Sequence, residues 1–192
     1  NNTGRTMLFL KTAPVGVDIP IQKLQSYLHE KLLTKWSLQN ADYEAYGRCY
    51  RNQKEAGYVA EVYVGGNEYK EVYLDDRIAA ISFFGLSGDI DHVVTNIADV
   101  HLVFWVNIKL LYPSITHRGD EEVRKDVQVL VDNGYQGFEF TGMRMGIERV
   151  HQEYRGTIMA AQANLDPLKF RDMHPYHCFR LDFKLTYNIN RC

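Results

Sequence analysis

The 192-residue sequence has few cysteines, no excess of basic charge and no long apolar run. Cys49, Cys178 and Cys192 form an odd and widely spaced set, which excludes a disulfide framework and indicates a reducing compartment. The net charge of −2 argues against a nucleic-acid-binding surface that extends over the whole chain. The longest apolar run, residues 102–106, is far shorter than the ~20 residues of a transmembrane helix, and residues 7–10 are too few for the apolar part of a signal peptide.

The sequence also lacks the short motifs that carry catalysis or nucleotide binding. It contains no GxSxG, which would place a nucleophilic serine, and no GxxxxGK[ST], which would cradle phosphates. The zinc-binding patterns CxxC and HExxH are absent as well. We therefore predict no enzymatic activity, no catalytic residue, no metal site and no cofactor.

One cluster of potential metal ligands was weighed against that prediction. His174, His177 and Cys178 lie close together in the sequence, and His117 or His151 could complete a set of zinc ligands. However, neighbouring residues of a strand point to opposite faces, so His177 and Cys178 cannot easily bind the same ion. A junction between a loop and a strand, carrying polar residues, is the favoured interpretation.

A second cluster is acidic. Asp89, Asp91 and His92 could bind a cation or supply a general base, although a short acidic segment is more typical of a solvated turn. A metal-dependent hydrolase with a site built from His174, His177, Asp89 and Asp91 is therefore kept as an alternative function. Residue identity alone motivates it.

The clearest pattern that is present lies at residues 177–189, where apolar and polar residues alternate almost without fault. Side chains of a strand point to opposite faces with period two, so the pattern predicts a strand with one buried and one wet face. Antiparallel sheets commonly have one packed and one solvated side. We expect a wet face, or one that lines a polar channel, carrying Arg180, Asp182, Lys184 and Thr186.

Two segments show the period of an amphipathic helix. In residues 18–36, Asp18 is the candidate N-cap, and four apolar residues follow at helical spacing. In residues 120–134, Asp120 is the candidate N-cap and Gly134 ends the helix. The predicted fold is a single α+β domain over residues 1–192, an antiparallel sheet packed against an N-terminal amphipathic helix and a second helix that lies between the long central strand and the C-terminal strands.

Further strands and turns are predicted between these landmarks. Gly65, Gly66 and Asn67 predict a hairpin turn that requires positive φ. The segment 143–154 fits both a helix and a strand, and a helix is favoured. The other predicted elements are strands at 46–50, 58–64, 69–74, 78–84, 100–112 and 135–140, a loop at 85–96 and a long loop insertion at 156–175.

The long central strand has two semi-apolar faces. Val103 and Trp105 lie opposite the face that would pack on a helix, so either a helix or another subunit covers them, and a subunit contact is favoured. The charged corner at residues 75–77 could bind a cation, but a salt bridge within the corner is favoured. The predicted interface residues are Val103, Trp105, Asp75, Asp76, Arg77, Arg180 and Lys184.

The order of elements in the second half is similar to that of one known family. A strand with Trp-Val-Asn-Ile at 105–108 leads to Pro113, a helix starts with Asp-Glu-Glu at 120–122, and the last strand ends in Leu-Thr-Tyr at 185–187. Together with the helix at 18–36, this order resembles the tail-terminator, or tail-completion, proteins of tailed bacteriophages. The resemblance covers topology over most of the chain.

The resemblance implies a structural virion protein with no enzymatic step. Such a protein would form a homo-oligomeric ring in the neck or tail, assembled in the host cytoplasm, that joins portal and tail or caps the tail tube. Its partners would be copies of itself and neighbouring portal, connector or tail proteins, with no membrane. Genomic DNA would pass through the ring without sequence-specific binding. A small-ligand-binding α+β domain with an aromatic cavity under the helix is a further alternative.

Overall fold

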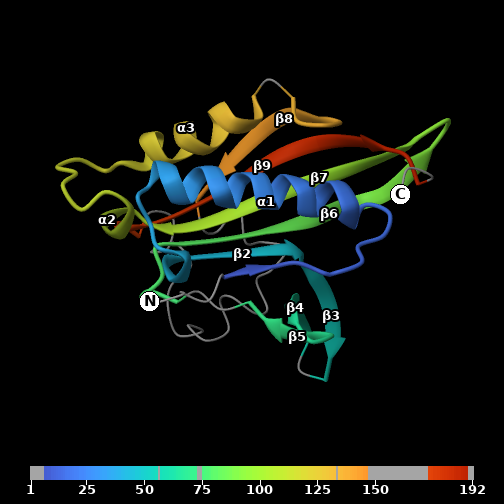
Figure 1. The fold of residues 1–192 in the computed structure, drawn as a ribbon, viewed down its shortest axis with the longest axis horizontal. Helices are drawn as coiled ribbons and strands as arrows, with labels where there is room; N and C mark the ends of the chain where they lie inside the picture. The colour runs from blue at the N-terminus through green and yellow to red at the C-terminus, as the bar shows by residue number, and fades with distance from the viewer. Residues whose placement is uncertain (1–6, 56, 73–74, 133, 147–172, 190–192) are drawn as a thin grey trace.

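The computed structural model describes residues 7–55, 57–72, 75–132, 134–146 and 173–189 (Figure 1). These residues form the predicted α+β class, with a six-stranded and a three-stranded sheet. The helices in this part of the chain are α1 (Asp18–Lys35), α2 (Ile108–Leu111) and α3 (Asp120–Val131). The large sheet consists, in spatial order, of β1 (Leu8–Phe9), β2 (Tyr43–Arg48), β6 (Ala80–His92), β7 (Asn96–Asn107), β9 (Tyr176–Tyr187) and β8 (Phe138–Met145).

The large sheet is mixed, so the prediction of an antiparallel sheet is wrong for its first three strands. β1 and β2 pair in parallel, as do β2 and β6, whereas β6, β7, β9 and β8 are antiparallel neighbours. Parallel neighbours require a long connection between them. Helix α1 supplies that connection between β1 and β2, and the small sheet supplies it between β2 and β6.

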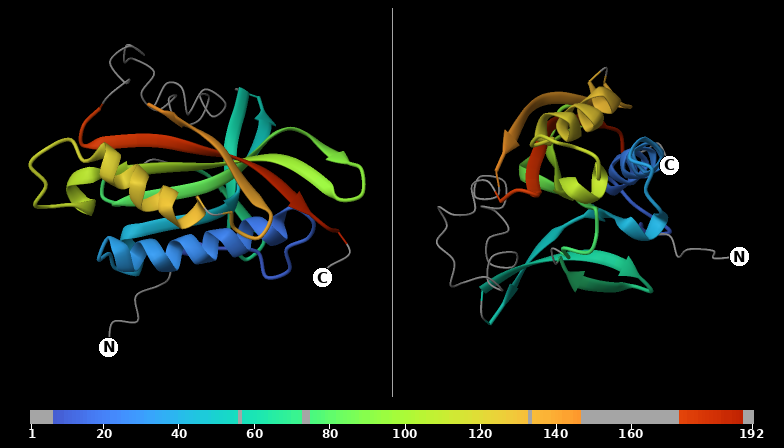
Figure 2. Two further views of the ribbon diagram at one scale, coloured as in Figure 1. Left: turned by 90° about the horizontal axis from the view of Figure 1, so that it is seen from above. Right: turned by 90° about the vertical axis from the view of Figure 1, so that its left-hand side faces the viewer.

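One face of the large sheet packs against α1 and α3, which lie on the same side (Figure 2). The predicted stripe of α1 is fully buried there, and so is the apolar row of β9. Phe104 of β7 stacks on Phe179 of β9, with ring centroids 5.2 Å apart, at the centre of this core. The stripe of α1 consists of Ile21, Leu24, Leu28 and Leu32, and the row of β9 consists of Phe179, Leu181, Phe183 and Leu185.

The opposite face carries a second, smaller apolar core under the three-stranded sheet of β3 (Tyr50–Lys54), β4 (Gly57–Gly65) and β5 (Glu68–Glu71). Ala60 and Val62 of β4 pack with Val103 and Trp105 of β7. Val103 is fully buried and Trp105 is 7% exposed. The chain therefore covers this face itself with the three-stranded sheet, and the favoured expectation of a subunit contact over these two residues is wrong.

Several predicted boundaries differ from the structure. The predicted loop at 85–96 is wrong, because β6 continues to His92 and pairs with β7, leaving only residues 93–95 as the hairpin tip. The predicted strand at 100–112 ends at Asn107, and α2 follows. Met143 and Met145 belong to β8 rather than to a helix. Residues 147–154 and most of the predicted loop at 156–175 lie outside the described residues.

The predicted turn is correct, and both long helices begin within one residue of their predicted positions. Gly65, Gly66 and Asn67 all have positive φ, as the hairpin between β4 and β5 requires. Neither predicted aspartate is an N-cap, however, because Val17 precedes α1 and Gly119 precedes α3 at that position.

Candidate functional site

The hairpin between β6 and β7 carries an exposed apolar tip. Val93 and Val94 are 80% and 85% exposed, respectively, and Ile90 beside them is 42% exposed. The hairpin projects at one end of the large sheet (Figure 1). Below the tip, the Nδ1–H of His92 donates a hydrogen bond to Oδ1 of Asn96 over 2.7 Å. Because turns favour glycine and small polar residues, the turn itself does not require two adjacent valines.

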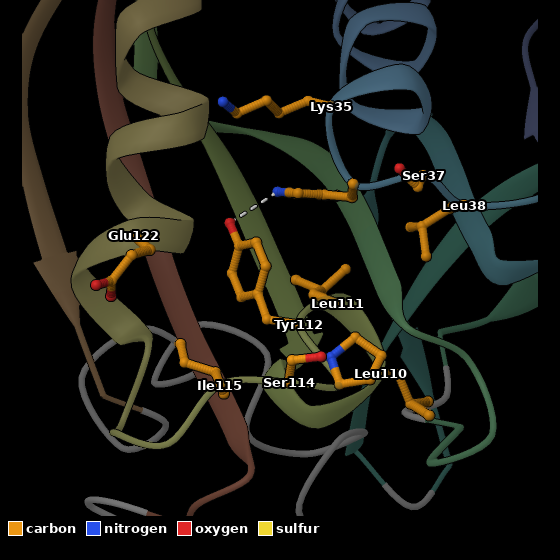
Figure 3. Close-up of a pocket in the computed structure, with 11 residues that line it drawn as sticks. Lys35, Ser37, Leu38, Leu110, Leu111, Tyr112, Ser114, Ile115 and Glu122 are labelled. Carbon is orange, nitrogen blue, oxygen red and sulfur yellow. Dashed lines mark hydrogen bonds between the residues drawn. The ribbon is translucent and has the colours of Figure 1, made fainter.

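A pocket of about 520 Å³ lies at the other end of the molecule, between the end of α1, the α2 segment and the start of α3 (Figure 3). Its walls are mainly apolar, and its rim is charged at Lys35 and Glu122. Leu110, on the rim, is 42% exposed. The apolar lining comes from Leu38, Leu110, Leu111, Pro113 and Ile115.

Hydrogen bonds fix the aromatic floor of this pocket. The Trp36 Nε1–H donates to Oδ2 of Asp126 over 3.0 Å and to the Tyr112 hydroxyl over 3.2 Å. The Tyr112 hydroxyl donates to the same Asp126 carboxylate. Burial and this hydrogen bond raise the pKa of Tyr112 above its usual range, so the hydroxyl stays protonated and remains a donor. The network holds both rings in place without leaving a reactive group.

Gly119 shapes one wall of the pocket. Its φ is +73°, and a Cβ at this position would lie 2.5 Å from Cδ1 of Ile115 and 2.8 Å from Cγ2 of Ile108. The left-handed backbone conformation favours glycine here, and a larger residue would also displace the Ile115 side chain. The short-range pattern around Gly119 did not reveal this role, because it depends on the approach of Ile108, eleven residues away.

A polar cluster lies on the sheet face opposite the helices. The Nε of Arg180 donates to Oδ1 of Asp182 over 2.6 Å, and the Nε of Arg144 lies 3.3 Å from Oδ2 of the same carboxylate. The Oγ of Ser87 lies 2.9 Å from Nδ1 of His101, which is fully buried. Burial and the positive charges of Arg180 and Arg144 lower the pKa of His101 to about 3. A histidine with so low a pKa binds a proton too weakly to be an effective general base near neutral pH, so this cluster fits a structural role better than a catalytic one.

A second ionic cluster anchors the start of α1. The Asp18 carboxylate accepts hydrogen bonds from Nζ of Lys11 and Nε of Arg48, each over 2.9 Å. The Tyr50 hydroxyl lies 2.6 Å from Nζ of Lys11. Burial alone would lower the pKa of Lys11. Its hydrogen bonds to Tyr50 and Asp18 together have the larger effect, and they raise this pKa above its usual range. The carboxylate that the sequence suggested as a helix cap therefore joins α1 to β2 and β3.

The structure does not gather the predicted interface residues on one surface. Val103 and Arg180 are buried register partners, and Trp105 is also buried. Lys184 is exposed, and its register partner on β7 is Asp99. Asn107, at the end of β7 nearest the charged corner, lies eight residues farther along the strand, or about 26 Å away at 3.3 Å per residue.

The charged corner lies near the Asn107 end of β7, where the Asn107 side chain reaches the Asp76 carbonyl over 3.5 Å. Its predicted internal salt bridge is confirmed. Asp75 accepts hydrogen bonds from Nε and Nη2 of Arg77 over 2.9 and 2.8 Å. Those bonds lower the pKa of Asp75 to about 2.

The residues of the alternative hydrolase site are far apart. Asp91 pairs with Ile97 at one end of β7, whereas His177 pairs with Val106 near the other end. Nine residues of strand separate the two positions along β7, which corresponds to about 30 Å. In the described part of the chain, no three His, Cys, Asp or Glu side chains are placed to hold a metal ion. His151 lies outside that part.

The described thiols are also unsuited to nucleophilic chemistry. Burial and the charge of Glu61 raise the pKa of Cys49 to about 12, and burial raises the pKa of Cys178 well above its usual value. A nucleophilic cysteine needs a thiolate and access to solvent. Both residues are buried, so they serve as small apolar core residues.

Sequence reasoning missed the tip and the pocket. The tip did leave a signal, because two adjacent valines stood within a segment otherwise predicted to be a polar loop. The pocket left none, because its walls come from segments separated by more than 70 residues in the sequence.

Comparisons of the chain with protein-family models, with curated proteins and with solved structures gave no match. Among the described residues, no helix has both the length and the apolar composition that a bilayer crossing requires.

Proposed function

We propose that this chain is a structural subunit of a tailed bacteriophage particle. In this role it forms a homo-oligomeric ring in the neck or tail and joins portal and tail, or caps the tail tube. It has no enzymatic step, and DNA passes through the ring without sequence-specific contacts. The topology of the second half, which resembles tail-terminator proteins, is the basis for placing it in a virion.

The observation that carries the proposal of assembly is the exposed apolar tip at residues 93–95. Val93 and Val94 stand clear of both apolar cores and contribute little to the folding of one subunit. Exposed apolar groups that neither the fold nor the turn requires are typical of contact sites with other proteins. The near-neutral charge fits a ring that lets DNA pass, because phosphate contacts dominate affinity for DNA.

The location of the protein tests this proposal. Mass spectrometry of purified particles, combined with negative-stain imaging of labelled subunits, is expected to find the chain in virions, at the neck or tail, in a fixed copy number. Light scattering of the purified chain at high concentration is expected to show a closed oligomer. Presence in infected cytoplasm together with consistent absence from particles would refute the virion role.

A small-ligand-binding domain is the second candidate, and the pocket beside Trp36 and Tyr112 favours it. Its volume of about 520 Å³ lies within the range of ligand sites, and its apolar walls with a few polar groups are typical of them. Native mass spectrometry of the chain purified from its natural host distinguishes the two candidates. A retained small molecule that Leu111→Glu abolishes would support ligand binding.

A further inference from the structure

We infer that the hairpin tip at residues 93–95 of one subunit inserts into the pocket between α1, α2 and α3 of a second copy. This inference rests on the proposed assembly function and specifies the contact through which assembly occurs. The occupant of the pocket is then Val93 and Val94 of the neighbouring chain, and the ligand class is an apolar hairpin of this same sequence.

The two surfaces lie at opposite ends of one strand. The tip immediately precedes β7, and α2, which forms part of the pocket, immediately follows it. Twelve residues of strand place them roughly 35 Å apart. A tip therefore cannot reach the pocket of its own chain. A contact between two different patches is heterologous, and repeated head to tail it closes into a ring or continues as a filament.

The chemistry of the two surfaces matches. The tip presents two β-branched apolar side chains, and the aliphatic part of the pocket lining consists of leucine, isoleucine and proline beside the rings of Trp36 and Tyr112. The network of Trp36, Tyr112 and Asp126 fixes the floor before any partner arrives. Pre-organised walls and a rigid hairpin reduce the ordering that association requires.

Charge also matches around the contact. Asp89 and Asp91 are exposed on the β6 side of the hairpin. Lys35 lies on the pocket rim, and Lys109 is exposed on α2. Rim charges of opposite sign chiefly steer association and fix orientation. Glu122 is the acidic group on the rim, and it lies 3.4 Å from Nε2 of His117.

Site-directed cross-linking tests the contact directly, even if association is weak. Two variants are made in a Cys192→Ser background, one with Val94→Cys at the tip and one with Leu110→Cys at the pocket. Cys49 and Cys178 are buried and give little background reaction. A short bis-maleimide is expected to link the two variants into heterodimers when they are mixed. Val129→Cys, which replaces a valine 57% exposed on α3, is the matched control for Val94→Cys.

A yield no higher than that of the Val129→Cys control would overturn the inference. A chain that carries both Val94→Cys and Leu110→Cys is expected to give a ladder of multimers, because each subunit then offers one tip and one pocket. A product that stops at dimers would also contradict a head-to-tail contact.

Mixing of two blocked variants provides an independent test. Val93→Ser with Val94→Ser removes the apolar tip and is expected to weaken self-association about a hundredfold, since each buried valine contributes roughly tenfold or more. Leu110→Asp blocks the pocket. Each variant alone is expected to remain monomeric, whereas their mixture forms pairs and nothing larger, because one intact tip and one intact pocket remain.

The outcomes separate this contact from the function. If the serine variant assembles like the wild type and is found in particles, the tip does not mediate the contact but the virion role stands. If the wild type is absent from particles yet cross-links through tip and pocket, the contact stands and the virion role fails. Circular dichroism confirms that each variant is folded.

Discussion

Phe104 and Trp105 are neighbours in β7, but their side chains lie on opposite faces of the large sheet. The two faces differ in the residues that they bury. Phe104 lies in a continuous apolar core under α1 and α3. Trp105 lies in a smaller core under the three-stranded sheet and stacks on Tyr176, with ring centroids 5.8 Å apart. Farther along β7, the same face carries His101 beside Arg180 and Asp182 rather than apolar groups.

This difference between the two faces determines which part of the fold loses stability when the pH changes. The helix-covered face depends mainly on apolar burial, which hardly varies with pH, and its buried ionisable side chains include His29, whose pKa is lowered by burial. The opposite face contains buried ionisable groups, whose contribution depends on pairing and protonation.

The largest effect is expected at the centre of the helix-covered core. Phe104→Ala removes a fully buried ring stacked on Phe179 and is expected to lower the free energy of unfolding by about 4 kcal/mol. Urea unfolding followed by circular dichroism measures the change. Val129→Ala, at an exposed site, is the control and should change stability by less than about 0.5 kcal/mol. A loss below about 1 kcal/mol for Phe104→Ala would contradict the packing described.

The next effect concerns the ion pair on the opposite face. Asp182→Ala removes the carboxylate that Arg180, 4% exposed, binds over 2.6 Å, and is expected to cost about 3 kcal/mol. The double variant Asp182→Ala with Arg180→Met should recover most of that loss, because no buried charge remains at position 180. A double variant as unstable as the single one would show that the pair does not act as a unit.

His101 is expected to make the protein sensitive to acid. Its pKa is about 3 in the folded chain and near 6.5 in the unfolded chain, so below pH 6.5 the unfolded state binds more protons. Stability should therefore fall as pH decreases from 6.5 towards 3, by about 2 kcal/mol at pH 5. Urea unfolding of wild type and His101→Asn between pH 5 and 8 tests this. Equal slopes for the two proteins would exclude His101 as the source.

The smallest effect is expected at the exposed end of the polar row of β9. Lys184→Ala should change the free energy of unfolding by less than about 0.5 kcal/mol, although Lys184 shares its face with Arg180 four residues earlier. Thermal unfolding of the variant provides the measurement. A loss comparable to that of Asp182→Ala would mean that the two ends of the row do not differ.

Some parts of the fold could be predicted from the sequence, and particular residues show which. The stripe of α1 and the alternation of β9 were visible, because a helix or strand with one buried side must repeat with its own period. Strand direction was not visible, because alternation is the same for parallel and antiparallel neighbours. The covering of Val103 by Ala60 and Val62 was also hidden, since it joins segments about 40 residues apart.

The candidate site was harder to predict from the sequence than the fold. Val93 and Val94 stood in the sequence as an anomaly, but their exposure became meaningful only when β6 proved to extend to His92 and made residues 93–95 a tip. The pocket required α1, α2 and α3 to converge. The hydrogen bond that holds its aromatic floor joins Trp36 to Asp126, 90 residues away.

Local sequence patterns were enough to predict the α+β class, the long amphipathic helix, the glycine turn at residues 65–67 and the final strand, because each depends on periodicity or on φ over a few residues. Tertiary structure decided the mixed strand order, the burial of Trp105, the neutral His101 and the placement of an apolar tip and an apolar pocket at opposite ends of β7. These properties depend on which distant segments meet, and short-range patterns do not encode that.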